Sequence, residues 1–506
     1  MEIFNSFFGS DIKREIELLR FLYKQNRFVS IEEISHVLKM DRRSIQKYYD
    51  FLVHSPLLTY EDRENILISK YGLGYKFVGT KKDYKALTKQ VLQSNPFFEL
   101  FETLFLENEI NLVKFAYENY VSESTVRKRL YELEKLLDPI GFTLKKNKGY
   151  VYLEGNEARI RYFMVTFFGR IFSGLHWPFP NISEEKCTQI SRNIYQAAQI
   201  EVNEIEIRIT TYLLATNVVR YRKCYRIDPD TLRLEPPLTG GDQLLFSQLI
   251  DKDTLIFKQL QNELDQHYVF DSTEINFIYY WLQSSLGSSF SDEQLNDYFP
   301  HSFSQSKTTT DLKKLIIAIS KDSDLKKLSA EKKQLILRTI LTGFLSVELF
   351  GDTDHTLTGY DMYDFVSQNF PNLFIQSEKI LTTLNIYEEE RKRKGLALHV
   401  ATAWTLIFPP SKFMKPIKIK LETDLPPVLE QNIKERIEAP FKNFYNIDIR
   451  SNFNDDEYDL YLSTASLTET LIEHPVLLIN AQVTLNDLLM IQKEIEAISQ
   501  NNMSRI

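Results

Sequence analysis

Basic and hydroxyl side chains gather on one face of residues 122–137. Apolar residues recur in this segment every three or four positions, which predicts a helix with one buried face. Ser122 is placed to cap its start. The opposite face carries Ser124, Thr125, Arg127, Lys128 and Tyr131, and a lysine-rich hairpin follows with Lys145, Lys146 and Lys148. Side chains of these types bind phosphates and base edges, so we predict that this surface contacts DNA.

A second set of such side chains occurs earlier in the chain. The outward face of a predicted helix after Asp41 carries Arg42, Arg43, Gln46 and Lys47. This face also suits contact with DNA, but Asp50 lies on it and the acidic segment 61–65 follows it, which reduces the positive charge. We therefore expect residues 122–148 to make the principal contacts with DNA.

The residue types that form catalytic and metal sites are sparse. The chain has eight histidines and two cysteines, Cys187 and Cys224, and none has the spacing of a zinc site or of a nucleophile with its base. Two cysteines give no disulfide framework, as is typical of a reducing cytoplasm. We predict no enzyme activity, no metal and no cofactor, and we expect a cytoplasmic protein.

Two groups of short helices, each followed by a hairpin, position the basic faces. Residues 11–54 have the periodicity of three helices, and two apolar runs on either side of the acidic segment 61–65 predict a hairpin. The same order repeats from Pro96, with a third helix that ends near Leu137 and a hairpin that turns at residues 147–149. This order predicts two winged helix-turn-helix units.

The rest of the chain changes pattern twice. Residues 157–405 are almost wholly helical in periodicity, and a loop-like stretch around residue 290 divides them into two bundles. After a proline-rich linker, residues 408–416, strands alternate with helices, which predicts a small α/β domain with a mainly parallel sheet. The basic run 391–394 follows three glutamates and precedes Gly395, so we expect it to end a helix.

The predicted fold is therefore multidomain and mainly α. We expect winged helix-turn-helix units at residues 1–80 and 81–165, helical bundles at 166–288 and 289–407, and the α/β domain at 413–506. The 506 residues exceed the size of one domain, and a composition that is 43% hydrophobic supports packed cores. The N-terminus lacks the pattern of a signal peptide, and charges interrupt the most apolar stretch, so we expect no membrane span.

Charge is unevenly distributed along the chain. The net charge is −8, but residues 1–161 carry 26 Lys and Arg against 23 Asp and Glu, a balance of +3, which leaves −11 for the remainder. A mildly basic N-terminal part on an acidic body is compatible with DNA binding by that part alone.

Residues 121–164 contain a recognisable order of motifs. A Ser-x-Ser-Thr helix start at Ser122 is followed by a leucine-striped helix, a wing, and a closing element made of Gly155, Glu157, Ile160 and Arg161. This segment resembles the second helix-turn-helix of the Mga and AtxA family of Gram-positive virulence regulators, with one extra residue between Gly155 and Glu157. The predicted order of domains resembles the family over essentially the full length.

The resemblance implies a transcriptional regulator, usually an activator, of virulence or metabolic genes. It implies that the two bundles are PRD domains, which the sugar phosphotransferase system controls by histidine phosphorylation. It also implies that the C-terminal domain is similar to enzyme IIB of that system and forms a dimer or larger oligomer. The implied partners are double-stranded DNA, a second copy of the chain and the phosphocarrier protein of the phosphotransferase system.

Two histidines are the candidates for phosphorylation under this resemblance. His399 lies in a predicted helix near the C-terminal domain, and His355 lies in a polar loop after a long helix. In the first bundle, Cys224 and Tyr225 occur where many PRDs place an Arg-x-x-x-Gly-His-like segment, which argues against phosphorylation there. In the C-terminal domain, residues 422–428 lack the cysteine that enzyme IIB phosphorylates, so we expect a binding or assembly module.

Two other interpretations compete with a DNA-binding regulator. The first is a signalling or assembly protein that binds protein partners and binds DNA only weakly, which the overall acidity favours. The second is a phosphotransferase enzyme, which the missing cysteine disfavours. Binding of DNA that weakens with salt would discriminate between these interpretations.

Overall fold

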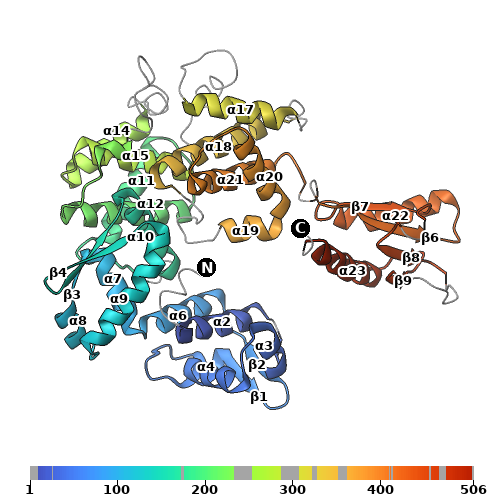
Figure 1. The fold of residues 1–506 in the computed structure, drawn as a ribbon, viewed down its shortest axis with the longest axis horizontal. Coiled ribbons are helices and arrows are strands. Elements are labelled where there is room, and N and C mark those ends of the chain that lie inside the picture. Colours follow the sequence, from blue (N-terminus) through green and yellow to red (C-terminus); the bar gives the residue numbers. More distant parts are fainter. Residues whose placement is uncertain are drawn as a thin grey trace. The chain divides into compact units, whose positions relative to one another are not determined.

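The protein is described by a computed structural model, drawn as a ribbon in Figure 1. The chain divides into two compact units. It describes residues 10–25, 27–172, 176–232, 254–286, 307–321, 328–351, 362–409, 411, 414–454, 457–465 and 474–503. The first unit comprises residues 1–309 and 344–362, and the second comprises residues 310–343 and 363–506.

The first unit begins with the three helices expected over residues 11–54. These are α2 (Ser10–Lys24), α3 (Ile31–Leu38) and α4 (Arg42–His54). Ser30 caps α3 and Asp41 caps α4, because their side-chain oxygens accept hydrogen bonds from the backbone N–H groups of Glu33 and Ser44. The three predicted helices are confirmed, and the apolar stripes of α2 and α4 are buried. In α3 only Ile34 is buried and Val37 is 51% exposed, so the expectation that this whole face is buried is wrong.

The first hairpin differs from the prediction. Residues 63–66 form the short helix α5 (Arg63–Ile66), and β1 (Leu67–Lys70) pairs antiparallel with β2 (Gly74–Phe77). The expected turn at 61–65 is therefore wrong, and the hairpin turns at residues 71–73. The cause is that Tyr75 and Phe77 alternate into the core while Gly72 and Gly74 adopt positive φ angles of 74° and 95°.

A helix that the sequence analysis did not predict connects the two winged units. This helix, α6 (Lys81–Gln93), begins with a capping box in which Thr80 and Asp83 each satisfy the other's backbone N–H group. Tyr84 of α6 stacks on Tyr23 of α2 at 4.4 Å between ring centroids. The connection between the two winged units is thus an ordered helix that packs on the first winged unit.

The second winged helix-turn-helix unit has the predicted order with one additional strand. It contains α7 (Pro96–Glu107), β3 (Glu109–Asn111), α8 (Leu112–Glu118), α9 (Glu123–Leu137), the 3-10 helix η1 (Asp138–Ile140), β4 (Thr143–Asn147) and β5 (Tyr150–Glu154). The strands form an antiparallel sheet in the order β3-β5-β4. The turn between β4 and β5 falls at residues 148 and 149, which confirms the predicted wing.

Helices follow directly after the second wing. They are α10 (Glu157–Phe172), α11 (Glu184–Ala197), α12 (Glu204–Arg222), the 3-10 helix η2 (Pro229–Leu232), α14 (Leu255–His267) and α15 (Ser272–Leu286). The expected domain boundary at residue 165 lies inside α10, because the apolar run through Phe168 continues one helix. The expected divide near residue 290 lies outside the described residues.

Further helices span residues 307–404. They are α17 (Lys307–Lys321), α18 (Ala330–Phe350), α19 (Met362–Asn369), α20 (Pro371–Thr383) and α21 (Glu390–Trp404). The basic run 391–394 begins α21, so the expectation that it ends a helix is wrong. Gly395 is buried inside α21, and Ala397 accepts a hydrogen bond from Ser377 of α20, which holds the two helices together.

The C-terminal domain has the predicted α/β pattern. Its elements are β6 (Ile417–Glu422), α22 (Pro427–Phe441), β7 (Ile447–Arg450), β8 (Leu460–Ser463), β9 (Val476–Leu478) and α23 (Leu485–Met503). The four strands are parallel in the order β7-β6-β8-β9, which confirms the predicted parallel sheet. Apolar residues of β6, β8, α22 and α23 form one core.

Candidate nucleic-acid interface

Helix α9 presents the basic face that the sequence predicts. Ser122 caps the helix by accepting a hydrogen bond from the backbone N–H of Thr125 at 3.1 Å. The stripe of Val126, Leu130, Leu133 and Leu137 is buried. Arg127, Lys128 and Tyr131 are consequently exposed on the opposite side. A helix held in this way can insert its free face into the major groove, where side chains reach base edges.

The side chains on this face differ in the interactions that they make. Arg127 donates to Glu123 at 3.0 Å, but both side chains are exposed, so phosphate can replace the carboxylate. Lys128 has no carboxylate within 4.0 Å among the described residues. The hydroxyls of Ser124 and Thr125 lie 2.8 and 2.7 Å from the Ser122 hydroxyl, which ties them to the cap. The face therefore offers two cations close to the helix start.

The second wing places three lysines beside α9. Lys146 of β4 pairs with Glu134 of α9 at 2.9 Å, and Lys145 pairs with Glu154 of β5 at 2.9 Å. Lys148 lies in the turn with a φ of 46° and has no carboxylate partner in the described part of the chain. The wing is thus tied to α9 through Lys146, and Lys148 remains as a cation without a carboxylate partner at the turn.

The first winged unit is less strongly basic on the corresponding face. Arg42 pairs with Glu32 at 2.8 Å, and Lys47 pairs with Asp11 at 3.1 Å. The hydrogen bond from Lys47 lowers the pKa of Asp11 below its ordinary value, so this carboxylate stays charged. Gln46 bonds to Asp50, whereas the exposed Arg43 has no ion-pair partner among the described residues. The charge of α4 is therefore largely balanced within the unit.

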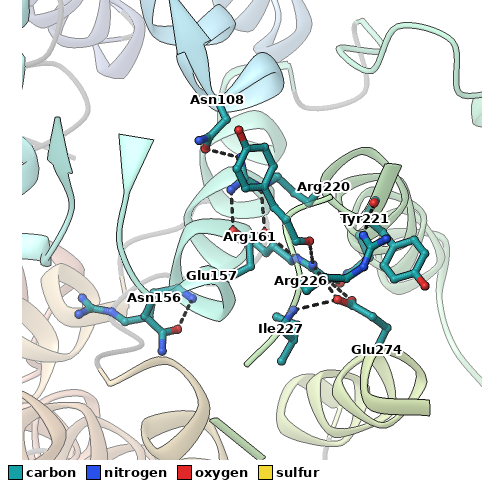
Figure 2. A network of polar contacts seen from close by, with 12 residues as sticks. Asn108, Asn156, Glu157, Arg161, Arg220, Tyr221, Arg226, Ile227 and Glu274 are labelled. Atoms are coloured by element: carbon teal, nitrogen blue, oxygen red, sulfur yellow. Dashed lines mark hydrogen bonds and ion pairs between the residues drawn. The ribbon is translucent and has the colours of Figure 1, made fainter. Parts of the chain in front are cut away.

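A buried cluster of charges joins the second winged unit to the helices that follow it (Figure 2). Arg161 of α10 and Arg220 of α12 are almost completely buried. Glu157 accepts hydrogen bonds from both guanidinium groups, at 2.9 and 2.8 Å from their Nε atoms. Glu274 of α15 binds Arg161 through both carboxylate oxygens, at 2.5 and 3.1 Å. Two arginines are thus balanced by two carboxylates.

Asn108 extends this cluster to the second wing. Its side-chain oxygen accepts a hydrogen bond from Arg220 at 2.7 Å, as Figure 2 shows. Its side-chain amide donates to the backbone carbonyl of Leu153 in β5 at 3.0 Å, and the N–H of Leu153 donates to its backbone oxygen at 3.2 Å. A continuous series of hydrogen bonds therefore runs from the wing to α15, which ties the orientation of the wing to these helices.

Sequence reasoning did not identify this cluster as a functional element. Glu157 and Arg161 belong to the closing element of the family resemblance, and their spacing of four residues places both on one helix face. That spacing is the one signal in the sequence. It does not distinguish an exposed ion pair from a buried one whose other partners come from distant helices.

Of the two histidines that are candidates for phosphorylation, the structure describes His399. His399 is partly buried on α21, and a Cβ atom added at Gly343 of α18 would lie 2.7 Å from the Cβ of His399. Helices α18 and α21 therefore approach closely at this histidine because residue 343 is glycine. Burial lowers the pKa of His399 to about 4, so its imidazole is neutral at pH 7. His355 lies outside the described residues.

This depressed pKa predicts a loss of stability in mild acid. An unfolded histidine has a pKa near 6.5, so below that pH the unfolded chain binds a proton that the folded chain excludes until about pH 4. The contribution of His399 to stability is therefore complete above pH 6.5 and declines as the pH falls from 6.5 to 4. We expect the urea midpoint to fall more between pH 7 and pH 5 in the wild type than in His399→Asn.

The comparison with the variant is needed because other buried groups titrate in the same range of pH. Burial raises the pKa of Glu15 and of Glu102 to about 7, so these carboxyls stabilise the folded chain at low pH, with the opposite sign. Their effect is common to both proteins. Equal changes of midpoint in the wild type and in His399→Asn would show that His399 does not produce the acid sensitivity.

The loop after β6 has no thiol, and two prolines stand at the start of the helix that follows it. No cysteine occurs in residues 422–428, and Pro426 and Pro427 begin α22 without backbone N–H groups. Helix starts bind phosphate through such N–H groups. Asp424 instead accepts a hydrogen bond from Thr464 of the neighbouring loop at 3.1 Å. The geometry is consistent with the expected assembly module, which stays a prediction.

Neither a membrane-spanning helix nor a cluster of metal ligands occurs among the described residues. No helix among them is both long and apolar enough to span a membrane. In the same part of the chain, no three His, Cys, Asp or Glu side chains converge to hold a metal ion.

The fold of residues 80–168 is that of a known class of DNA-binding domain. This segment, from α6 to α10, matches the family of the Mga helix-turn-helix domain. It contains α9 and the second wing, the surface on which the exposed cations lie. Residues 80–168 are therefore a winged helix-turn-helix domain of the Mga type.

Similar proteins extend this resemblance beyond one domain. A Streptococcus pneumoniae serotype 4 protein named as a trans-acting regulator is 24% identical over 214 residues, 41% of each chain. The Bacillus anthracis capsule synthesis positive regulator AcpB is 22% identical over 280 residues, 51% of this chain and 57% of that one. The Bacillus anthracis anthrax toxin expression trans-acting positive regulator is 21% identical over 316 residues, 61% and 59%.

These similarities confirm the resemblance to the Mga- and AtxA-type regulators that residues 121–164 predict. The matches span 41 to 59% of the length of these relatives. All three relatives are named as regulators and none as an enzyme.

Proposed function

We propose that the protein is a DNA-binding transcriptional regulator, of the activating kind, whose second winged unit makes the principal contacts with DNA. The observation that carries this proposal is the exposed basic face of α9 beside a wing with a free lysine at its tip, within a segment that matches the Mga helix-turn-helix domain. Two relatives are named as positive regulators, which supports activation of virulence or metabolic genes.

Selection of DNA from a random-sequence pool tests the proposal. The full chain is immobilised, incubated with the pool at moderate salt, and the bound duplexes are amplified and sequenced over several rounds. We expect enrichment of a sequence motif, with half-sites spaced by about one helical turn if two copies bind together. A pool whose composition does not change would contradict DNA recognition and favour a signalling or assembly protein that binds protein partners.

The alternative is a signalling or assembly protein with weak DNA binding. Its support is the net charge of −8 and the ion pairs that neutralise α4. We rank it second because those ion pairs are exposed, and exposed pairs are readily exchanged for contacts to phosphate.

We further propose that a second copy of the chain binds the C-terminal domain. Strand β9 ends the parallel sheet and exposes Val476 and Leu478, and the first turns of α23 expose Leu485 and Leu489. An edge strand offers unpaired backbone groups, and exposed apolar side chains lose contact with water when another chain covers them. Self-association of this kind would double the number of DNA-binding units per particle.

Truncation before Ser411 is expected to abolish self-association. The shortened chain keeps the winged units and the helices but loses the sheet edge that exposes apolar side chains. Sedimentation of the full-length and truncated chains at the same concentration measures the effect. Equal sedimentation of both as dimers would place the contact among the helices instead.

The remaining proposal is control by phosphorylation through the phosphocarrier protein, at His399 or at His355. A phosphoryl group on His399 would bring about two negative charges into the close contact between α18 and α21. The expected result is that these helices separate and the oligomer loosens. Mass spectrometry after treatment with the phosphotransferase enzymes tests this, and an unmodified pair of histidines would contradict it.

A further inference from the structure

Helix α6, which connects the two winged units, carries positive charges that the chain does not balance. Lys81, Lys85 and Lys89 recur every four residues and therefore lie along one side of the helix. We call these three residues the lysine row. Lys82 is exposed next to its first member. None of the four lysines has a carboxylate within 4.0 Å in the described part of the chain.

The one carboxylate of α6 is engaged elsewhere. Asp83 accepts hydrogen bonds from the backbone N–H and the hydroxyl of Thr80, at 2.6 and 2.7 Å, and from the hydroxyl of Tyr60. Asp83 is two positions from both Lys81 and Lys85, a spacing at which side chains on a helix do not face each other. The carboxylate therefore serves the helix cap and does not neutralise the lysine row.

Partial burial makes these charges costly to the chain alone. The pKa of Lys85 lies below its ordinary value, because burial disfavours the charged amine and because Lys81 repels it. Burial also lowers the pKa of Lys89, whose amine lies 5.9 Å from the centre of the Phe172 ring of α10. The carboxyl of Glu102 acts on Lys89, but burial raises its pKa to about 7, so it supplies only part of a charge. A bound anion would remove this cost.

Arg20 of α2 adds a further cation without a counter-charge. Its Nε and Nη2 atoms are buried and have no hydrogen-bond partner among the described residues. Arg20 precedes Tyr23 by one turn, and Tyr23 stacks on Tyr84 of α6. Buried guanidinium donors are ordinarily satisfied, so this arginine is an exception that calls for an explanation. Its charge adds to the positive potential of the region where α2 and α6 meet.

We propose that the lysine row binds phosphates of double-stranded DNA and supplies affinity that does not depend on base sequence. The proposal rests on the proposed DNA-binding function. Successive lysines of the row are about 6 Å apart along the helix axis, so the row extends over about 12 Å. A ligand with charges repeated along its length suits such a row better than a single small anion, and a DNA duplex has this property.

The position of α6 in the fold favours the same ligand. The helix contacts α2 of the first winged unit and α7 of the second, so the lysine row belongs to the junction of two units that we propose to bind DNA. Side chains that contact phosphates position a protein on DNA without reading its sequence. We therefore expect α9 to determine the choice of sequence and the lysine row to add affinity for any sequence.

The test measures the affinity of the full chain for a duplex, by fluorescence anisotropy, at several salt concentrations. We expect Lys81→Gln with Lys85→Gln to weaken binding several-fold at low salt. The slope of log affinity against log salt should become shallower by about 2, because each phosphate contact contributes about 0.9. Glutamine retains a long side chain and a good helix propensity. Lys81→Arg with Lys85→Arg keeps both charges and should keep the slope of the wild type.

The matched control is Lys415→Gln with Lys442→Gln. This variant removes two exposed lysines of the C-terminal domain, so the change in net charge is the same. We expect its affinity and slope to stay close to those of the wild type. An equal loss in both variants would show that total charge governs binding, and an unchanged affinity and slope in the α6 variant would show that the row does not contact DNA. Either result would overturn the proposal.

A second comparison uses a duplex selected by the protein and a scrambled duplex of the same length. Contacts to phosphate do not depend on sequence, so the α6 variant should lose affinity for both duplexes by the same factor. Arg127→Ala with Lys128→Ala should instead reduce the preference for the selected duplex. A loss in the α6 variant that is confined to the selected duplex would contradict the proposed role of the row.

Two outcomes separate this proposal from the function on which it rests. If the wild type binds neither duplex at low salt, the DNA-binding function itself fails. If the α6 variant binds DNA as the wild type does but no longer activates a reporter, the row contacts an acidic protein and the phosphate proposal is wrong. Equal urea midpoints would show that the fold is intact. Should the midpoint fall, Lys81→Gln with Lys82→Gln, at two exposed positions, replaces the first variant and should still give a shallower slope.

Discussion

Replacing Glu274 by alanine is expected to lower the free energy of unfolding of the first unit by about 3 to 5 kcal/mol. The reason is that Glu274 binds Arg161 through two hydrogen bonds in a site that water does not reach. Its removal leaves a buried guanidinium with less than its compensating charge, and it also removes the acceptor of the backbone N–H of Ile227. Urea unfolding followed by tryptophan fluorescence measures the loss, since Trp281 lies on the same helix.

The matched control is Glu204→Ala. Glu204 also binds an arginine, Arg192, through two hydrogen bonds of 2.9 and 2.7 Å, but this pair is exposed to water. Exposed ion pairs contribute little, so the urea midpoint should change far less. Equal shifts in the two variants would mean that the buried cluster stabilises the fold no more than a surface ion pair does.

Replacing both Arg127 and Lys128 by alanine is expected to give the largest loss of DNA affinity. Each side chain that contacts a base should contribute about 1 to 3 kcal/mol, and each phosphate contact adds to the dependence on salt. Both residues lie on the exposed face of α9, one turn from the cap at Ser122, so the substitutions leave the packed stripe intact. Fluorescence anisotropy with a labelled duplex measures the change.

The control for this double substitution is Arg391→Ala with Lys392→Ala. These residues also form an adjacent basic pair in the first turn of a helix, but the helix is α21 of the second unit. The change in net charge is the same. An equal loss of affinity in both variants would show that total charge, and not the face of α9, governs the binding.

Helices with local signals could be predicted from the sequence. The stripe of α9, its cap at Ser122 and the cap of α4 at Asp41 depend on residues within a few positions of one another. The parallel sheet of the C-terminal domain follows from the alternation of strands and helices. Local propensity and tertiary packing agree in these elements, so the pattern was sufficient.

The first hairpin and α6 could not be predicted as well. Two apolar runs around an acidic segment resemble a hairpin, but the pairing is decided by the packing of Tyr75 on Tyr49 and by two glycines with positive φ. Helix α6 buries few apolar residues and carries several lysines, which weakens its periodic signal. Tertiary contacts determined both outcomes.

The buried cluster is the part of the structure that the sequence conceals. Arg161 and Glu274 are separated by 113 positions, and no local pattern relates them. Charged residues on helices are usually exposed, so the default expectation places both in water. Only the packing of α10, α12 and α15 brings them together.

The dependence of DNA affinity on salt tests the central claim most directly. The full-length wild type and the variant with Arg127→Ala and Lys128→Ala are titrated with the same duplex at several salt concentrations. We predict that the wild type loses affinity steeply as salt rises, and that the variant binds more weakly with a shallower slope, because it releases fewer counterions. The same affinity and slope in both proteins would contradict the assignment of α9 as the DNA-contacting helix.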